Sequence, residues 1–385
     1  MADRQQIRTA QSRATDARTA VREFHAAVIQ TEITLVVFFC SSDYDLEALA
    51  REMDRMFAGV QVVGCTTAGE IGPAGYCEHS LAGASFPAAT CTAVTGHLDR
   101  LQQFGIGQGQ SFVQSLLQQL QTRALTANPQ NSFAFMLIDG MSAREEQVTR
   151  VLQYALDKLP LFGGSAGDGL KFVATHVYHD GRFHADSAVL ILITTSLPFK
   201  IFKTQHFVSG DERLVVTAAD GAKRIVKEIN GLPAAEEYAR LVGVDVRDLD
   251  PQRFAASPVV VLIDGTDYVR SIQKANPDGS LTFYCAIEEG LVLRVAHGVD
   301  LVNNLEQTLA KLRAEIGPPQ VILGCDCILR NLEISQCGLK DRVEQIFRDN
   351  NTVGFSTYGE QFHGVHVNQT LTGIAIGAPP ETPHV

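Results

Sequence analysis

The octapeptide Val-Gly-Cys-Thr-Thr-Ala-Gly-Glu occupies residues 63–70, and Val-Gly-Phe-Ser-Thr-Tyr-Gly-Glu occupies residues 353–360. The displacement is 353 − 63 = 290 residues, and the pairing extends without a gap over 24 positions, to Phe86 and Ile376, with seven identities. Chance would give about one or two identical positions, because common residues each make up roughly 5 to 8 per cent of a protein. An apolar strand pattern and a helical pattern precede each copy. The sequence therefore predicts a duplicated strand, helix, strand unit.

A further segment resembles these two copies. An apolar strand pattern at 133–138 and a helical pattern at 143–159 precede Leu-Phe-Gly-Gly-Ser-Ala-Gly-Asp at 161–168, which matches the repeated motif with one residue removed. Helices alternating with strands indicate an α/β fold. We therefore expect two mixed-sheet domains flanked by helices and related by partial internal duplication.

The expected boundaries follow from changes of pattern along the chain. From residue 199 the pattern becomes extended and mixed. A helix is then expected at 234–241, just after Pro233, because proline is common at the start of a helix. The tail contains three prolines and should be irregular. The predicted ranges are an N-terminal helical leader at 1–30, a first domain at 31–215, a second domain at 216–377 and the tail at 378–385.

Composition limits the class of protein. The chain has 385 residues, 45% of them hydrophobic, and a formal net charge of −11, which disfavours binding to nucleic acid or to an anionic membrane. The longest apolar stretches are far shorter than the ~20 residues that cross a bilayer. Eight cysteines in this length do not indicate a disulfide scaffold. We expect a cytoplasmic protein with reduced thiols.

Several motifs resemble the FIST family, a two-part sensory module of bacterial signalling proteins, over nearly the whole chain. The N-terminal FIST pattern is matched by Gly-Cys-Thr-Thr-Ala-Gly-Glu-Ile at 64–71 and by Phe-Gly-Gly-Ser-Ala-Gly-Asp at 162–168. The C-terminal pattern is matched by residues 229–234, 276–281, 325–330 and 354–360. The resemblance implies a sensory function rather than an enzymatic one.

The last stretch, 358–370, departs from the commoner FIST ending and resembles NosP, the nitric-oxide-sensing haem subgroup. That resemblance implies a histidine-ligated, non-covalent haem b, nitric oxide as the ligand and a histidine kinase as the partner. The chain carries no kinase, receiver or cyclase sequence, so any output would pass through a separate protein. The sequence leaves open whether the chain forms a homodimer.

The same resemblance points to His366, and after it His363, as the iron ligand. Their ungapped partners in the first copy are Tyr76 and Pro73, so the repeated scaffold does not require histidine there. A neutral imidazole binds haem iron well. Tyr358 is a candidate to ligate or hydrogen-bond the iron, and we expect Phe362 to help form an apolar pocket.

Three alternatives remain open at this point. A haem-free module would bind a polar small molecule, such as an amino acid, between its domains. Cys325, Cys327 and Cys337 allow a zinc or redox interpretation, although Cys-x-Cys is not a standard zinc spacing. The sequence around Ser165 satisfies Gly-x-Ser-x-Gly, the nucleophile elbow of hydrolases, but the repeat explains its glycines better as a turn.

Acidic residues end all three turns, at Glu70, Asp168 and Glu360. Such a carboxylate can accept hydrogen bonds from backbone amides of a following turn, or it can face a bound amine. For each residue alone, the structural role is the stronger interpretation.

Overall fold

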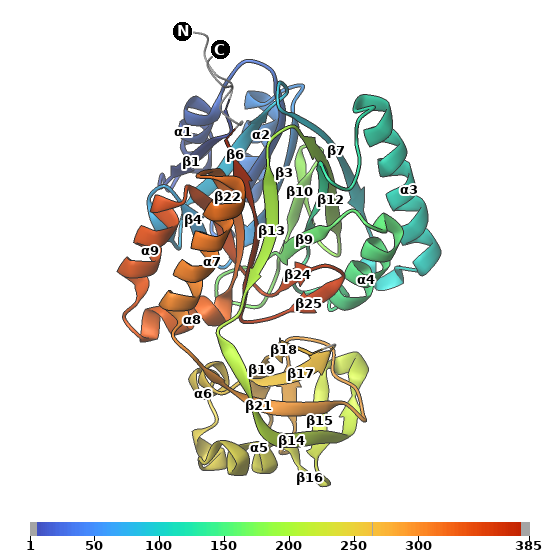
Figure 1. The fold of residues 1–385 in the computed structure, drawn as a ribbon, viewed down its shortest axis with the longest axis vertical. Coiled ribbons are helices and arrows are strands. Elements are labelled where there is room, and N and C mark those ends of the chain that lie inside the picture. The colour runs from blue at the N-terminus through green and yellow to red at the C-terminus, as the bar shows by residue number, and fades with distance from the viewer. Residues whose placement is uncertain (1–5, 264, 379–385) are drawn as a thin grey trace.

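The computed structural model describes residues 6–263 and 265–378 and consists of two lobes. A large body contains residues 6–205 and 300–378, and a small lobe contains the intervening residues 206–299. The chain enters and leaves the small lobe through two short crossings that lie next to each other, because Val299 N donates to His206 O at 2.7 Å. The body lies above the small lobe in Figure 1.

The body is built from three units that share one plan: a strand, helix, parallel strand, hairpin and return strand. The first unit contains β2 (Ile33–Ser41), α2 (Leu46–Met56), β3 (Gln61–Thr67), β4 (Glu70–Gly72), β5 (Gly75–Cys77) and β6 (Leu81–Pro87). The second contains β8 (Ser132–Ile138), α4 (Glu145–Leu156), β9 (Leu161–Ser165), β10 (Val177–His179), β11 (Arg182–His184) and β12 (Ala188–Thr195). The third contains β22 (Pro319–Cys327), α8 (Ile328–Gln336), α9 (Lys340–Asp349), β23 (Thr352–Thr357), β24 (Glu360–Phe362), β25 (Val365–Val367) and β26 (Leu371–Gly377).

Each unit contributes its hairpin to the sheet of another unit. The hairpin β4–β5 pairs with β23, the hairpin β24–β25 pairs with β9, and the hairpin β10–β11 pairs with β3. The exchange is cyclic, so the three units form one body rather than a chain of independent domains. An edge strand completes each sheet: β1 (Arg8–Ser12), β7 (Cys91–Leu98) and β13 (Phe199–Thr204).

The three sheets share one central apolar core. Phe39 of the first unit stacks on Phe355 of the third, with ring centroids 4.6 Å apart, and Phe135 stacks on Phe162 in the second. The outer face of each sheet is covered by amphipathic helices. These are α1 (Ala17–Val28) and α2 on the first sheet, α3 (Ile106–Arg123) and α4 on the second, and α7 (Leu301–Ile316) and α9 on the third.

The small lobe has a separate core and a sheet whose strands pair antiparallel. Two helices, α5 (Ala234–Val242) and α6 (Pro251–Ala256), accompany this sheet. Its strands are β14 (Phe207–Asp220), β15 (Ile225–Ile229), β16 (Leu232–Pro233), β17 (Val259–Ile263), β18 (Thr266–Arg270), β19 (Ile272–Ala275), β20 (Leu281–Phe283) and β21 (Val292–Gly298).

The predicted α/β class with mixed sheets and internal repetition is confirmed. The predicted boundary near residue 215 does not coincide with the lobes, because residues 300–378 return to the body and complete its third sheet. The expected leader at 1–30 contains α1, but β1 and α1 belong to the first sheet and its helical cover. Of the expected tail at 378–385, residues 379–385 lie outside the described part of the chain.

Candidate functional site

The repeated turns meet in the middle of the body. Each turn donates one backbone amide to the next unit, and the three bonds are equivalent under the repeat: Ala68 N to Ser356 O at 2.9 Å, Tyr358 N to Ser165 O at 3.3 Å, and Gly167 N to Thr66 O at 2.9 Å. The motif that dominates the sequence is therefore the joint between units. It is a structural scaffold, and specialised chemistry must be sought where the units differ.

The acids that end the turns hold backbone and neighbouring hydroxyl groups. Glu70 Oε2 accepts from Ser80 N at 2.9 Å and from Ser80 Oγ at 2.8 Å, and Glu360 Oε2 repeats this pattern with Thr370. Asp168 accepts from three successive amides of the loop that follows it. Burial raises the pKa of Glu70 to about 8 and raises the pKa of Glu360 well above its usual range. The hydrogen bonds of these acids stabilise the repeated turns and the loops that follow them.

His366 lies on β25, at the rim of a cavity between the lobes, and is 2% exposed. Its Nδ1 is 3.3 Å from Gln361 Nε2, and its Nε2 is buried with no hydrogen-bond partner among residues 6–263 and 265–378. Burial lowers the pKa of this imidazole to about 4, so the ring is neutral at physiological pH. In the other two hairpins the equivalent residues are Tyr76 and Phe183, so all three hairpins place a ring at this position.

The other predicted site residues do not converge on His366. His363 is exposed in the turn between β24 and β25, where its φ is 46°. Its ring lies edge-on to Phe362, which is half-buried. Tyr358 stacks on Phe172 at 4.6 Å and donates its hydroxyl hydrogen to the carboxylate of Asp168. It lines a separate cavity of about 170 Å³.

The packing around His366 does not fit haem iron in this conformation. A Cβ added to Gly359 would lie 2.7 Å from Nε2 and 2.3 Å from Cε1, so this edge of the ring faces the Gly359 backbone. A metal on an imidazole needs about 2.0 Å in the direction of the lone pair, with its further ligands beyond it. Phe355, Ile374 and Ile376, apolar residues of the same repeat unit, lie in the central core between the sheets.

A cavity of about 650 Å³ lies between the lobes. The body contributes the loop before α4, the first turns of α4 and the β24–β25 hairpin. The small lobe contributes the turn before β15, the end of β18 and a loop before β21. Charged side chains from both lobes line it: Arg144, Glu146 and Arg150 from the body, and Arg224, Arg270 and Glu288 from the small lobe. The cavity therefore presents charged side chains from both lobes to any molecule that enters it.

One buried ion-pair network bridges the lobes beside the cavity. Arg224 Nη2 lies 2.6 Å from Glu145 Oε2 and 2.7 Å from Glu146 Oε2, and Ala286 N also donates to Glu146. Burial raises the pKa of Glu145 to about 7, against the opposing effect of Arg224. Burial also acts to raise the pKa of Glu146, but His366 and Arg224 together hold it below the usual value. The small lobe is thus tied to the N-terminus of α4.

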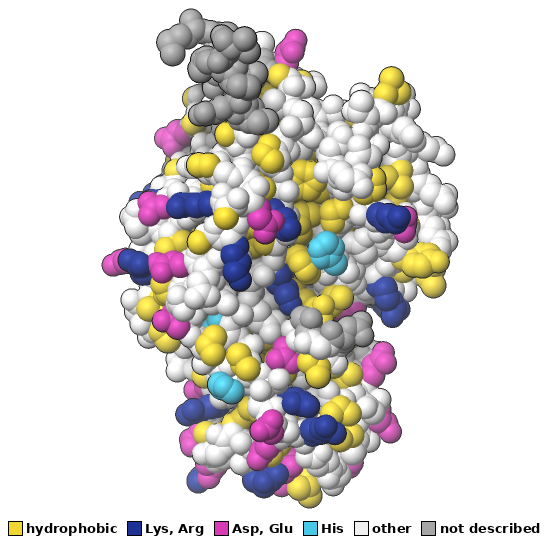
Figure 2. Space-filling view, viewed as in Figure 1, with side chains coloured by type: hydrophobic (Ala, Val, Ile, Leu, Met, Phe, Trp, Pro, Cys, Tyr) yellow, Lys and Arg dark blue, Asp and Glu magenta, His cyan; other side chains and the backbone are white. Residues whose placement is uncertain are grey.

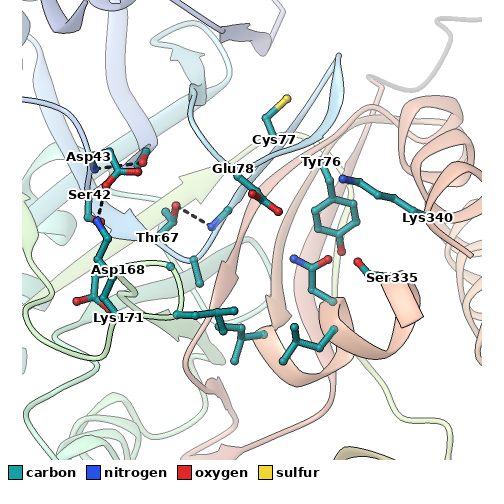
Figure 3. A pocket seen from close by; sticks show the side chains of 18 residues that line it. Ser42, Asp43, Thr67, Tyr76, Cys77, Glu78, Asp168, Lys171, Ser335 and Lys340 are labelled. Atoms are coloured by element: carbon teal, nitrogen blue, oxygen red, sulfur yellow. Dashed lines mark hydrogen bonds and ion pairs between the residues drawn. The ribbon is translucent and has the colours of Figure 1, made fainter. Parts of the chain in front are cut away.

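A second, smaller pocket of about 250 Å³ lies between the first unit and α8 (Figure 3). Lys171 pairs there with Asp43, as the dashed line in Figure 3 shows, while Lys340 and Glu78 have no ion-pair partner among the described residues. All its side chains come from the body. It offers polar contacts but no route by which a ligand would reposition the small lobe.

The alternative sites from the sequence find little support in the geometry. Residues 6–263 and 265–378 contain no group of three or more His, Cys, Asp or Glu side chains that could hold a metal. Cys325 and Cys327 are buried, and burial raises the pKa of both thiols well above the usual value, whereas Cys337 is exposed. Ser165 is fully buried, and within the described chain its hydroxyl is bonded only to the amide of Gln361.

Sequence patterns did not identify the charged residues of the interlobe cavity. Arg224 lies in the turn before β15 and Arg270 at the end of β18, and Glu145 and Glu146 look like ordinary acids of a first helical turn, which the helix dipole favours. Arg224 is 79 residues from Glu145 and 78 residues from Glu146 in sequence, and no motif spacing links the arginine to the acids. The available signal was weak: two adjacent acids at the start of a helix, of which Glu145 is buried and Glu146 half-buried in the fold.

Comparisons with known proteins confirm the resemblance to the FIST family, and no comparison identifies the NosP subgroup. The FIST N domain model matches residues 34–232, and the FIST C domain model matches residues 234–363. No curated protein matches the chain. Among solved structures, one titled "Cyanuric acid hydrolase: evolutionary innovation by structural concatenation" is similar at 11% identity and a TM-score of 0.37, covering 97% of this chain and 99% of that one.

A cyanuric acid hydrolase from A. caulinodans is similar at 10% identity and a TM-score of 0.28, covering 51% of this chain and 70% of that one. These likenesses are too weak to carry a functional argument. In the described part of the chain, no helix has the length and apolar character needed to cross a membrane.

Proposed function

The chain belongs to the FIST family of sensory domains, and on that premise we propose that it binds a polar small molecule in the cavity between its lobes. The observation that carries this proposal is the placement of charged side chains from both lobes around one cavity. A ligand held from both sides favours one lobe arrangement over others, and the binding free energy then shifts that equilibrium. A separate signalling protein, such as a histidine kinase, would read the resulting surface.

The connection between the lobes suits such a response. Only the crossings at 205–206 and 299–300 join them covalently. Their non-covalent contacts include the Arg224 network, the His206–Glu333 pair at 2.9 Å and the hydrogen bond from Gln369 Nε2 to Ala255 O at 2.7 Å. Hinge motions usually concentrate in a few residues at element ends. A bound ligand would therefore act by favouring one arrangement of these contacts over another.

Filling the cavity with a large side chain is expected to weaken ligand binding at least tenfold. We suggest testing amino acids, organic acids and nucleotides by thermal shift and calorimetry on the native chain and on Ala222→Trp. Ala222 is exposed and lines the cavity on the small-lobe side, so its indole would occupy ligand space. A compound that binds the native chain should lose at least tenfold in affinity.

Ala26→Trp, at an exposed position on α1, is the matched control and should bind normally. Equal binding by both variants would place the ligand outside this cavity and contradict the proposal.

Haem-based sensing of nitric oxide is the second candidate. The observation that favours it is the unpartnered Nε2 of His366 at the cavity rim, and the contact with Gly359 opposes it. If this candidate holds, protein expressed with ample haem is coloured, contains about one iron per chain and shows a Soret band that His366→Ala removes. The exposed His363→Ala variant is the control and should keep the band. A colourless native protein excludes this candidate.

A further inference from the structure

Resting on the proposed function, we infer that the ligand of the interlobe cavity is a small anion with at least two negative charges. Arg144 and Arg150 of the body and Arg270 of the small lobe would bind it jointly. The cavity lining contains four arginines and two glutamates, a formal charge of 4 − 2 = +2, which becomes 4 − 3 = +1 when Glu145, the second carboxylate on Arg224, is included. The whole chain has a formal charge of −11, so this local excess runs against the overall composition.

The three arginines lack carboxylate partners within the described chain. Arg144 Nη2 contacts only Gln102, at 3.4 Å from its backbone oxygen and 3.3 Å from Oε1. Arg270 Nη1 donates to His366 O at 3.1 Å, while its Nε is buried and has no hydrogen-bond partner. Arg150 is exposed at the cavity wall without an ion pair. A buried guanidinium N–H without an acceptor is costly, and an anion would supply that acceptor.

The acids of the cavity do not neutralise these groups. Glu146 is already engaged by Arg224 and by the amide of Ala286. Glu288 is exposed and forms no ion pair in the described chain. Elsewhere on the molecule, acidic side chains lie beside many of the basic ones, as Figure 2 shows. The cavity is therefore positive because Arg144, Arg150 and Arg270 form no ion pair within the described chain.

Arginine identifies the chemistry of the ligand. Its planar guanidinium binds carboxylate and phosphate oxygens through paired hydrogen bonds, and these bonds strengthen away from bulk water. Arginines from both lobes require an anion with two or more charged groups, or one multiply charged group, to satisfy them together. Carboxylates and phosphates share this chemistry and must be separated by experiment.

Calorimetry on the full chain tests the inference with four probes: tricarballylate, inorganic phosphate, the zwitterion glutamine and the dication agmatine. We expect an anionic probe to bind, and Arg150→Gln and Arg270→Gln each to raise its Kd at least tenfold. Arg18→Gln, at an exposed position on α1, is the control and should bind normally. Raising the salt from 50 to 200 mM should weaken binding of the anion.

The outcomes separate the two proposals. Binding of tricarballylate alone identifies a carboxylate ligand, and binding of phosphate alone identifies a phosphate ligand. If only glutamine or agmatine binds, and Ala222→Trp abolishes that binding, the anion inference is overturned while the proposed function stands. If an anion binds equally well to Ala222→Trp and to the arginine variants, both proposals fail for this cavity.

Discussion

Replacing Arg224 by glutamine is expected to weaken the contact between the lobes by about 3–5 kcal/mol, the typical cost of removing one partner of a buried ion pair. The side chain of Glu145 is 3% exposed and that of Arg224 is 13% exposed, so solvent screens their interaction little. Without Arg224, the buried carboxylate of Glu145 and the half-buried carboxylate of Glu146 lose their shared cation at the start of α4. The lobes should separate at lower urea concentration, with faster proteolysis at the crossings and a larger radius of gyration.

The matched control tests whether the unpaired charge causes this loss. Combining Arg224→Gln with Glu145→Gln and Glu146→Gln removes all the buried charge and should recover most of the stability. Arg247→Gln alters an exposed arginine of the same lobe, whose side chain is 88% exposed, and should have no measurable effect. If Arg224→Gln alone opens at the same urea concentration as the native chain, the network does not hold the lobes together.

The pH dependence of the same contact follows from Glu145. Its pKa is about 7 in the fold and near 4.5 when unfolded, because burial disfavours the charged form. A raised pKa contributes stability that is fully present below about pH 4.5 and is lost as the pH rises through 7. The lobe contact should therefore be tighter at pH 6 than at pH 8. Loss of Arg224 should steepen this dependence, since the cation no longer offsets the carboxylates.

The sequence predicted the repeated frame well because that frame depends on local patterns. The glycine turns, the alternating strands and helices and the acids at 70, 168 and 360 all appear where the pattern placed them. Each has a cause within a few residues along the chain. The two most similar copies, 290 residues apart, could also be recognised in the sequence, because the geometry of the turn permits few alternative residues.

The assembly of the units could not be predicted in the same way. Nothing in the hairpin sequence states that β24–β25 will pair with β9 rather than stay beside β23. That choice depends on packing between segments almost 200 residues apart. For the same reason the sequence made His366 a candidate iron ligand. In the fold its ring faces Gly359 and takes the place of Tyr76 and Phe183 in the other hairpins.

Gly354→Ala is expected to destabilise the body by about 3 kcal/mol, at the upper end of the cost of overpacking a core. A Cβ on Gly354 would lie 1.9 Å from Gly324 O on the neighbouring strand, and backbone cannot move aside as a flexible side chain can. Gly64 and Gly163 hold the equivalent places in the other units, where the added carbon would lie 2.5 Å from Phe38 O and 2.3 Å from Met136 O, respectively. The repeated glycine is therefore required by close strand approach.

Urea unfolding of the three alanine variants measures this requirement unit by unit. Gly107→Ala is the control, because Gly107 lies in α3 with nothing within 4 Å of an added Cβ, and alanine should stabilise that helix by up to about 1 kcal/mol. We expect all three alanine variants to lose stability, and Gly354→Ala to lose the most, because its added Cβ lies nearest to a backbone oxygen. Because the units exchange hairpins, each loss should lower a single cooperative transition of the whole body. Separate transitions for separate units would show that the cyclic exchange does not couple their folding.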